Sequence, residues 1–374
     1  MPRYTSIAAG DPAPTFHQRS PTNPRYAFDT AAGRYIVLCF HASAGQPKGA
    51  QAIAAALARR DFDDDRACCF AVSNDPADEA EARLTNRPPG FRVFWDHDLR
   101  IARAYGVAPL APDTGPVLPR WVVIDPTLRV IDVIPFARDG GDIARLSALL
   151  DALPPVDRFA GIPLQAPVLF LPRVFEPDLC HRLITLYDAQ GGRLSGFMRE
   201  VGGRTVGLND PRHKARRDVM VEDADLIAAL QDRIRRRVVP EIAKVHQFHA
   251  TRMERYLVGC YTAEDGGHFA PHRDNTTTGT AHRRFAVSVN LNDDFAGGEV
   301  SFPEYARQGF KAPPGGAVVF SCALLHAVSK VTAGRRYAFL PFLYDDAAAR
   351  IRDANRHLVD SGGDRNLGAA APPG

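Results

Sequence analysis

Three side chains of metal-binding type, His272, Asp274 and His326, constrain the fold of this 374-residue chain more than any other feature. His272 and Asp274 are two positions apart, so on a β-strand both side chains point to the same face. His326 ends the apolar run 317–325, which predicts a second strand that enters a core. If all three side chains bind one ion, the fold must bring these two distant segments together.

The residue types of this set indicate which metal would bind. Two imidazoles and one carboxylate on one side of an ion form the facial triad of non-haem Fe(II) sites, which leaves other coordination positions open. Arg336 follows His326 by ten residues and precedes a further apolar strand, 337–340. A guanidinium held there would clamp a dicarboxylate bidentately, and more rigidly than a lysine would. The pattern therefore predicts an iron site with a dicarboxylate cosubstrate beside it.

Several motifs in a fixed order resemble a known enzyme family. They are His272-Arg273-Asp274, Gly297-Gly298-Glu299, Pro313 to Gly316, His326, and Gly334-Arg335-Arg336-Tyr337. The set resembles the 2-oxoglutarate/Fe(II)-dependent dioxygenases of the prolyl 4-hydroxylase type, over residues 166–346. From residue 252 onward the expected strands are short and separated by turns, as a jelly roll requires. The resemblance implies a double-stranded β-helix (jelly-roll) domain with flanking helices.

The resemblance also implies roles and a reaction. Fe(2+) would be bound by His272, Asp274 and His326, and 2-oxoglutarate by Arg336. Arg335 competes with Arg336 for this role. We prefer Arg336 because alternation along the strand places it on one face with Ala338 and Leu340, and because it directly precedes the aromatic residue, as the arginine or lysine of the family does. The implied reaction with O2 hydroxylates an unactivated C–H bond and releases succinate and CO2. The resemblance also suggests L-ascorbate as a further cofactor. The substrate stays open between a peptidyl proline, a free amino acid and another small metabolite.

Three other residues are candidates for the cosubstrate pocket. The strand expected at 285–292 alternates an apolar face with a polar face, and the polar face carries Ser288 and Asn290. A polar face inside a small barrel suits a cosubstrate cavity, so we expect both to contact 2-oxoglutarate. Tyr261 matches a tyrosine that lines the pocket in similar hydroxylases. A barrel aromatic residue whose hydroxyl is hydrogen-bonded elsewhere is an equally good interpretation of Tyr261.

The first half of the chain alternates strand and helix signals. Apolar runs at 35–40 and 67–73 predict strands buried on both faces, and the alanine-rich segment 50–60 predicts a helix between them. This alternation predicts an α/β fold with a mainly parallel sheet. The order of elements and the opening segment 10–14 resemble the thioredoxin and peroxiredoxin fold. In that resemblance Pro119 stands where the fold keeps a cis-proline.

Cysteine placement argues against redox catalysis in this half. Thioredoxin-like relatives carry W-C-G-P-C after the first core strand, and here Gly45 and Lys48 occupy the two cysteine positions. Such catalysis needs a thiolate. Cys39, Cys68 and Cys69 lie inside expected strands, where a free thiol acts as a small hydrophobic group. We therefore expect a redox-inactive scaffold, or a module that docks a protein partner.

Length and charge set further limits. A chain of this length predicts two or three domains: we expect a thioredoxin/peroxiredoxin-like domain at 1–155, the dioxygenase domain at 160–346, and a terminal helix with a disordered tail at 347–374. The segment 191–217 is rich in glycine and arginine and weakly periodic, which predicts a mobile loop. A net charge of only +3 implies no nucleic-acid partner. No apolar run has the length of a membrane span and no signal pattern is visible, so we expect no membrane association and a cytoplasmic location.

Two other functions stay open from the sequence. One is a non-enzymatic iron- or oxygen-responsive binding protein that uses the first half to dock a partner. Succinate formation that depends on iron and 2-oxoglutarate, and is lost in His272→Ala, would separate it from the hydroxylase. The other is a thiol peroxidase or disulfide reductase, which Gly45 and Lys48 disfavour because they replace the thiols.

Overall fold

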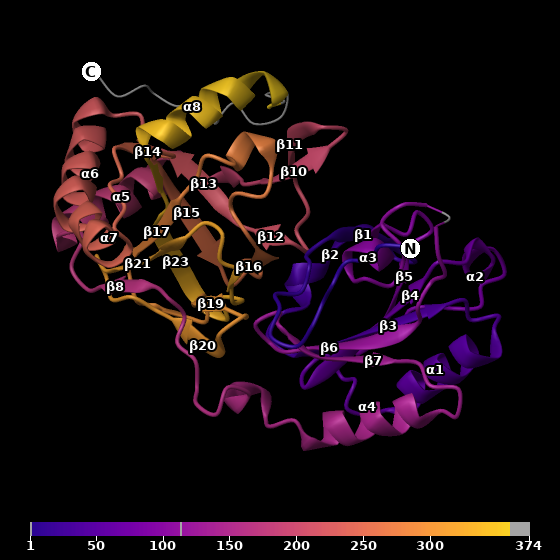
Figure 1. The fold of residues 1–374 in the computed structure, drawn as a ribbon. Helices are drawn as coiled ribbons and strands as arrows, with labels where there is room; N and C mark the ends of the chain where they lie inside the picture. The colour runs from indigo at the N-terminus through magenta and orange to yellow at the C-terminus, as the bar shows by residue number, and fades with distance from the viewer. Residues whose placement is uncertain (1, 113, 360–374) are drawn as a thin grey trace. The chain divides into compact units, whose positions relative to one another are not determined.

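The chain divides into two compact units. The computed structural model describes residues 2–112 and 114–359. The first unit extends to Gln165 and includes Pro303–Arg307, and the second begins at Ala166 (Figure 1). The disordered tail expected after Ser361 lies outside the described residues. Among the helices that the structure describes, none is long and apolar enough to cross a membrane.

A five-stranded mixed sheet forms the centre of the first unit. Its elements are β1 (His17–Ser20), β2 (Asn23–Ala27), η1 (Phe28–Ala31), β3 (Tyr35–Ala42), α1 (Pro47–Ala58), β4 (Ala67–Ser73), α2 (Pro76–Ala80), β5 (Phe91–Trp95), α3 (Arg100–Ala104), β6 (Arg120–Ile124), β7 (Val130–Pro135), α4 (Gly141–Ala152) and η2 (Val156–Arg158). The strand order is β5-β4-β3-β6-β7. Strands β3, β4 and β5 pair in parallel, whereas β6 is antiparallel to both β3 and β7. The sheet is therefore mixed, with β6 as the one reversed strand, and the short turn 125–129 permits only an antiparallel return from β6 to β7.

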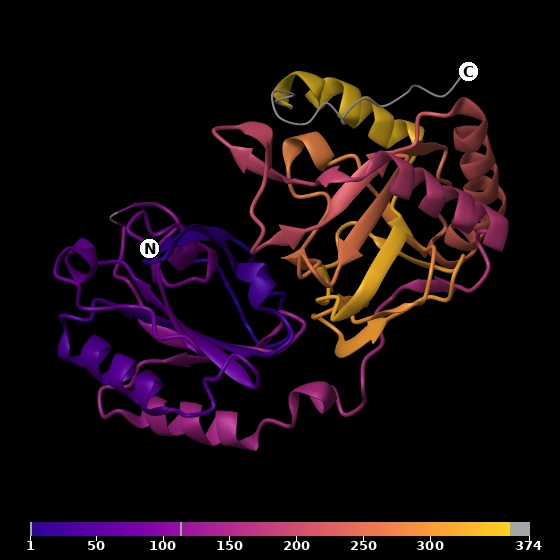
Figure 2. The same ribbon diagram turned by 180° about the vertical axis from the view of Figure 1, so that it is seen from behind.

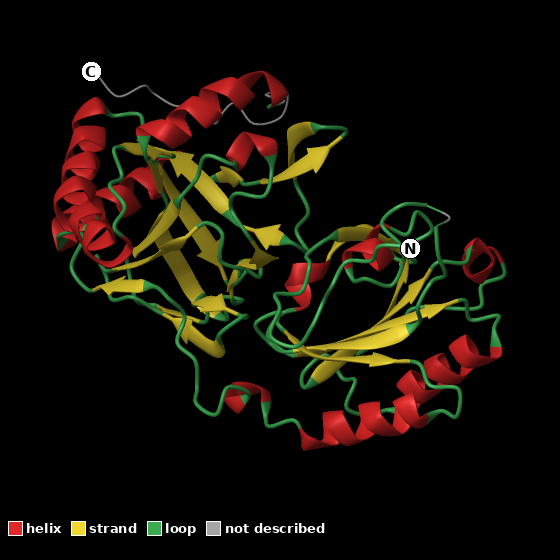
Figure 3. Cartoon of the chain, viewed as in Figure 1, coloured by secondary structure: helices red, strands yellow, loops and turns green. Residues whose placement is uncertain are grey.

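Helices α1 and α4 cover one face of this sheet (Figure 3). Alternate residues of β3, among them Val37 and Cys39, pack against both helices. The opposite face is aromatic, and includes Phe70 stacked on Phe94 with ring centroids 4.8 Å apart. Both faces of the central strands are thus buried, as their continuous apolar sequence predicts.

The prediction of a cis peptide bond before Pro119 is wrong. The described residues contain one cis bond, Pro88–Pro89, and the Leu118–Pro119 bond is trans. The trans form of an X–Pro bond is favoured by only about 0.5–1 kcal/mol, so the local sequence alone does not determine the isomer.

The described part of the second unit contains two large sheets, the two-stranded sheet β10-β11 and four helices. Its strands are β8 (Leu169–Leu171), β9 (Arg193–Leu194), β10 (Phe197–Val201), β11 (Arg204–Leu208), β12 (Lys214–Ala215), β13 (Arg217–Met220), β14 (Arg252–Glu254), β15 (Leu257–Thr262), β16 (His268–His272), β17 (Phe285–Asn290), β18 (Phe295–Ala296), β19 (Val300–Phe302), β20 (Ala306–Phe310), β21 (Ala317–Ser321), β22 (His326–Val328), β23 (Ala333–Phe339) and β24 (Phe342–Tyr344). Its helices are α5 (Pro177–Gln190), α6 (Ala224–Arg237), α7 (Val239–His246) and α8 (Asp346–Asn355), with short 3-10 turns η3 (Thr278–Thr280) and η4 (Arg356–Leu358). The smaller sheet has the order β12-β16-β22-β19-β20. The larger follows β14-β24-β17-β23-β15-β13-β9, with β21 beside β17 and β8 beside β21.

Helices α5, α6 and α7 lie on one side of the second unit (Figure 2). Leu226, Leu230 and Ile234 repeat every four residues, so they form one apolar face of α6 that packs into the core under the larger sheet. The Asp223 side chain accepts a hydrogen bond from the backbone N–H of Leu226 and caps this helix. The sequence pattern continues to residue 245, but the helix ends near Val238. Pro240 then occupies the first turn of α7, the position that proline tolerates.

The prediction of a loop at 191–217 is wrong, because this segment contains four short strands. Strands β10 and β11 form a hairpin whose turn is Gly202-Gly203, with φ of +57° and +75°. A glycine pair between two strands is a signal for a tight hairpin turn. Strands of two to five residues are too short for periodicity to reveal. This correction matters because β12 and the start of β13 border the candidate site.

Candidate active site

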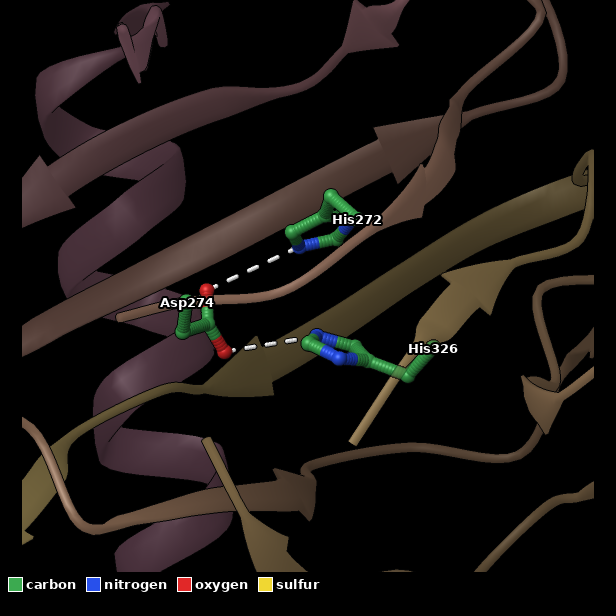
Figure 4. Close-up of side chains that lie close together, drawn as sticks. All are labelled: His272, Asp274 and His326. Carbon is green, nitrogen blue, oxygen red and sulfur yellow. Dashed lines mark ion pairs between the residues drawn. The ribbon is translucent and has the colours of Figure 1, made fainter. Parts of the chain in front are cut away.

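The pairing of β16 with β22 brings the three predicted metal ligands together. His272 is the last residue of β16 and lies opposite His326, the first residue of β22. Asp274 lies beyond the strand rather than on it, and its N–H donates to the carbonyl of Cys322 at 3.0 Å. His326 follows a turn and opens a new strand, whereas the sequence predicted that it ends one. The side chains nevertheless converge, with Asp274 between the two imidazoles (Figure 4).

Hydrogen bonds fix the orientation of both imidazoles. His272 Nδ1 lies 2.8 Å from the carbonyl oxygen of Ala270, and His326 Nδ1 lies 3.0 Å from that of Leu324. Because a carbonyl only accepts, each Nδ1 carries the proton and each Nε2 presents a lone pair. Nε2 of His272 lies 3.6 Å from Asp274 Oδ1, and Nε2 of His326 lies 3.3 Å from Oδ2. One ligand atom from each residue lies within 4.8 Å of the others, so this donor set fits a facial-triad ion.

Electrostatics favour the metal-binding protonation states. Burial, together with the neighbouring His326, lowers the pKa of His272 to about 4, so its imidazole is neutral near pH 7. Burial alone would raise the pKa of Asp274, but His326 and His272 hold it well below its usual range. A neutral imidazole and an ionised carboxylate are the forms that bind metal.

Arg336 lies in the same cavity as the triad, while Arg335 is exposed. The Arg336 side chain on β23 is fully enclosed, with 2% of the residue exposed. Its Nε donates to Asn290 Oδ1 at 3.0 Å, and its Nη2 donates to Ser288 Oγ at 2.7 Å. Within the described residues the buried Nη1 has no hydrogen-bond partner. An unpaired buried donor costs about 1–3 kcal/mol, and a carboxylate is the ligand that would satisfy it.

The structure gives the three predicted pocket residues different surroundings. Ser288 lines the cavity and also holds the guanidinium. Asn290 binds Arg336 and the carbonyl of Ala312, and does not border the cavity. The Tyr261 ring borders the cavity, with its centroid 5.3 Å from the guanidinium carbon of Arg336. Its hydroxyl accepts a hydrogen bond from Arg216 Nη1 at 3.3 Å, so both interpretations of this tyrosine hold together.

Sequence reasoning missed three cations that line the cavity: Lys214, Arg216 and Arg255. Burial holds the pKa of Lys214 well below its usual range, and burial with nearby Arg283 and Arg216 lowers the pKa of Arg255 to about 10. Two of the three fell in the segment expected to be a loop. The signal that could have found them is the alternation of charged residues at 214, 216 and 218, which places them on one face of an extended chain.

Comparison with known families agrees with these features. Residues 255–344 match the model of the 2OG-Fe(II) oxygenase superfamily, and this range contains the triad and Arg336. The segment that contains the candidate site is therefore similar to the 2OG-Fe(II) oxygenases. The protein is a dioxygenase whose cofactors are Fe(II) and 2-oxoglutarate. Residues 9–133 match the AhpC/TSA family, which confirms the thioredoxin-like assignment of the first half.

Individual relatives of the oxygenase domain are distant. A PKHD-type hydroxylase of Azoarcus sp. (strain BH72), azo0608, is 27% identical over 195 residues, which cover 47% of this chain and 82% of that protein. A viral collagen prolyl hydroxylase from Paramecium Bursaria Chlorella virus-1 is 16% identical over 48% of this chain and 97% of its own, with a TM-score of 0.35. A prolyl-4-hydroxylase from Pseudomonas putida is 15% identical over 50% of this chain and 96% of its own, also with a TM-score of 0.35.

Proposed function

We propose that this protein hydroxylates an unactivated C–H bond of a small-molecule or peptidyl substrate, with His272, Asp274 and His326 holding Fe(II). In this proposal Arg336 binds the far carboxylate of 2-oxoglutarate. The observation that carries it is the buried Arg336 Nη1, which has no partner among the described residues and belongs to the cavity that the triad lines.

The cavity lies between the two sheets, which supports our assignment of the double-stranded β-helix. The smaller sheet contributes His272 and His326, and the larger sheet contributes Tyr261, Ser288 and Arg336. A barrel of this kind encloses its ligand between opposing strands. We propose this arrangement for the whole segment from β8 to β24.

The residues around the cavity have distinct tasks in the proposed reaction. The backbone carbonyls of Ala270 and Leu324 hold the imidazoles so that Nε2 faces the ion. Ser288 and Asn290 hold the guanidinium. Apolar residues that line the cavity exclude water, and they include Val300, Phe320 and Val328. Bound Fe(II) and 2-oxoglutarate supply the oxidation of the C–H bond by O2, with succinate and CO2 as the coproducts.

The test is succinate release with Fe(II), 2-oxoglutarate and O2, over a panel of prolyl peptides and free amino acids, with and without ascorbate. We expect His272→Ala to abolish both iron binding and turnover. His268→Ala is the matched control on the same strand, because both nitrogens of His268 contact backbone carbonyls, of Gly266 and Arg212. Full iron binding by the His272 variant would exclude the proposed ligand set.

We propose that the thioredoxin-like unit is redox-inactive and serves as a scaffold or as a module that docks a protein partner. Its cysteines Cys39, Cys68 and Cys69 are at most 1% exposed, and burial raises the pKa of Cys68 to about 12. Thiols in that state do not form the reactive thiolate near neutral pH. Gly45 precedes α1 and Lys48 lies in its first turn, at the positions where a redox pair would stand. Peroxide or disulfide reduction by the whole protein, lost on replacement of a cysteine, would refute this proposal.

A further inference from the structure

The cavity carries more positive charge than the cosubstrate needs. In the proposed function, the charges of Fe(II) and Arg336 balance those of Asp274 and the 2-oxoglutarate dianion. Lys214, Arg216 and Arg255 line the same cavity and are not part of that balance. Among the described carboxylates, Asp218 is the one that pairs with two of these cations.

Arg216 makes four hydrogen bonds with its five N–H donors, all of them within the protein. Its Nε and Nη2 form two parallel bonds to Asp218, at 2.6 and 2.7 Å, and Nη1 donates to the Tyr261 hydroxyl. Lys214 Nζ donates to Ser195 Oγ at 2.7 Å and to the carbonyl of Gly196 at 2.6 Å. Lys214 Nζ also lies 5.0 Å from the centroid of the Phe269 ring.

Arg255 differs from both. Its Nη2 lies 3.6 Å from Asp218 Oδ2, and among the described residues its guanidinium makes no hydrogen bond. A second carboxylate that acts electrostatically on Arg255, that of Glu254, is already bonded by Arg283 Nε at 2.8 Å and by His282 Nε2 at 2.9 Å. Three-quarters of the Arg255 side chain is nevertheless buried. A guanidinium in this position retains the capacity to bind an anion bidentately.

The backbone at Arg255 supports a specific placement of this side chain. Its φ is +66°, a conformation that residues other than glycine rarely adopt. It occurs at the short break between β14 and β15, where Glu254 is buried with His282 and Arg255 borders the cavity. Such conformations persist only where the surroundings impose them, and they cluster at functional sites.

We propose that the primary substrate of this oxygenase carries a carboxylate, and that Arg255 binds it. The proposal rests on the proposed function, because it assigns the cavity's second ligand. It favours a free amino acid or another small carboxylic acid over a proline inside a neutral peptide. An acidic residue of a peptide would offer the same chemistry, so the test separates these two sources.

The experiment measures binding to the protein loaded with Fe(II) and 2-oxoglutarate under anaerobic conditions. The probes are the common L-amino acids with their C-terminal amides as matched partners, and neutral prolyl peptides with the same peptides bearing one glutamate. Calorimetry gives the affinity, and the visible absorption of the Fe(II)–2-oxoglutarate complex reports separately that the cosubstrate is bound. Arg255→Gln and Arg255→Lys are compared with Arg335→Gln, which alters an exposed arginine outside the cavity.

We expect carboxylates to bind and their amides to bind at least tenfold more weakly. Arg255→Gln should weaken carboxylate binding about ten- to hundredfold, the range for a lost hydrogen bond between charged groups. The carboxylate affinity of Arg255→Lys should lie between those of the wild type and Arg255→Gln. The absorption of the loaded iron site should stay unchanged in all three variants. Amides that bind as tightly as acids, or full affinity in Arg255→Gln, would overturn the proposal. Absence of the absorption band in the unaltered protein would instead count against the proposed function.

Discussion

Replacing Arg336 by methionine should separate cosubstrate binding from stability. Methionine keeps an unbranched apolar stem but removes the guanidinium whose Nη1 is buried without a partner. A hydrogen bond between charged groups contributes about 1.5–3 kcal/mol, so 2-oxoglutarate affinity should fall about ten- to hundredfold. The free energy of unfolding of the ligand-free protein should fall by less than the free energy of 2-oxoglutarate binding does. The variant gives up the hydrogen bonds to Ser288 and Asn290, but it no longer buries an unpaired charge.

Ligand-linked unfolding turns this expectation into numbers. At a 2-oxoglutarate concentration of 100 times the wild-type Kd, the cosubstrate should stabilise the unaltered protein by about 2.7 kcal/mol. At the same concentration, the methionine variant should gain only about 0.4–1.4 kcal/mol for a hundred- to tenfold loss of affinity. Both tryptophans, Trp95 and Trp121, lie in the first unit. Calorimetry, rather than tryptophan fluorescence, therefore follows the unit that binds.

The control is Arg335→Met, which removes the neighbouring exposed guanidinium. It should keep the full stabilisation by 2-oxoglutarate. If Arg336→Met also keeps it, the unpaired nitrogen does not face the cosubstrate, and the reasoning from buried donors fails. A loss in both variants would point to a general electrostatic attraction rather than a specific contact.

Three other predictions concern the same unit. Gly298 has φ +71°, and a Cβ added there would lie 3.0 Å from Val331 Cγ2 and 3.1 Å from Arg336 Cδ, so Gly298→Ala should weaken 2-oxoglutarate binding in a titration. Gly203 has φ +75° and open space around it, so Gly203→Ala should show only the cost of the backbone strain. Asp218→Asn should make the free energy of unfolding less dependent on pH in acid. Burial alone would raise the pKa of Asp218, but Arg216 and Lys214 outweigh it and lower the pKa to about 2. The ionised carboxylate therefore stabilises the wild type by on the order of 2 kcal/mol above pH ~4, and this contribution is lost as the pH falls towards 2. Urea unfolding from pH 5 to 2 measures this difference between variant and wild type. His272→Ala should lose Fe(II) binding in equilibrium dialysis while His268→Ala retains it.

Long elements and the choice of arginine could be predicted from sequence because each depends on local pattern. The strand 67–73 was predicted at its observed bounds, since a run buried on both faces is apolar throughout. Arg336 was separated from Arg335 by alternation, and the structure buries Arg336 and exposes Arg335. The association of His272 with His326 followed from chemistry rather than from pattern, because two imidazoles and a carboxylate bind one ion only if their strands pair.

What the sequence did not reveal depends on short elements and on partners distant in the chain. Strand β12 has two residues, too few for any period, so Lys214 was not placed in the cavity. Asp274 was expected on a strand, but β16 ends at His272 and the aspartate follows it. The bond of Asn290 to Arg336 joins residues 46 positions apart, and so a residue expected to touch the ligand holds the arginine instead.

The comparison of His268 with His272 shows how the site is defined. Both belong to β16, and in both Nδ1 contacts the carbonyl two residues earlier, at 2.8 Å. Their difference is the second nitrogen: Nε2 of His268 lies 3.1 Å from the carbonyl of Arg212, while Nε2 of His272 faces a carboxylate and a second imidazole. Arg216 and Arg255 differ in the same way, since one has its donors bonded within the protein and the other does not. We therefore propose that the ligand-binding groups of this cavity are those whose donor or lone pair the fold leaves without a hydrogen bond inside the protein, and this property appears only when distant segments are brought together.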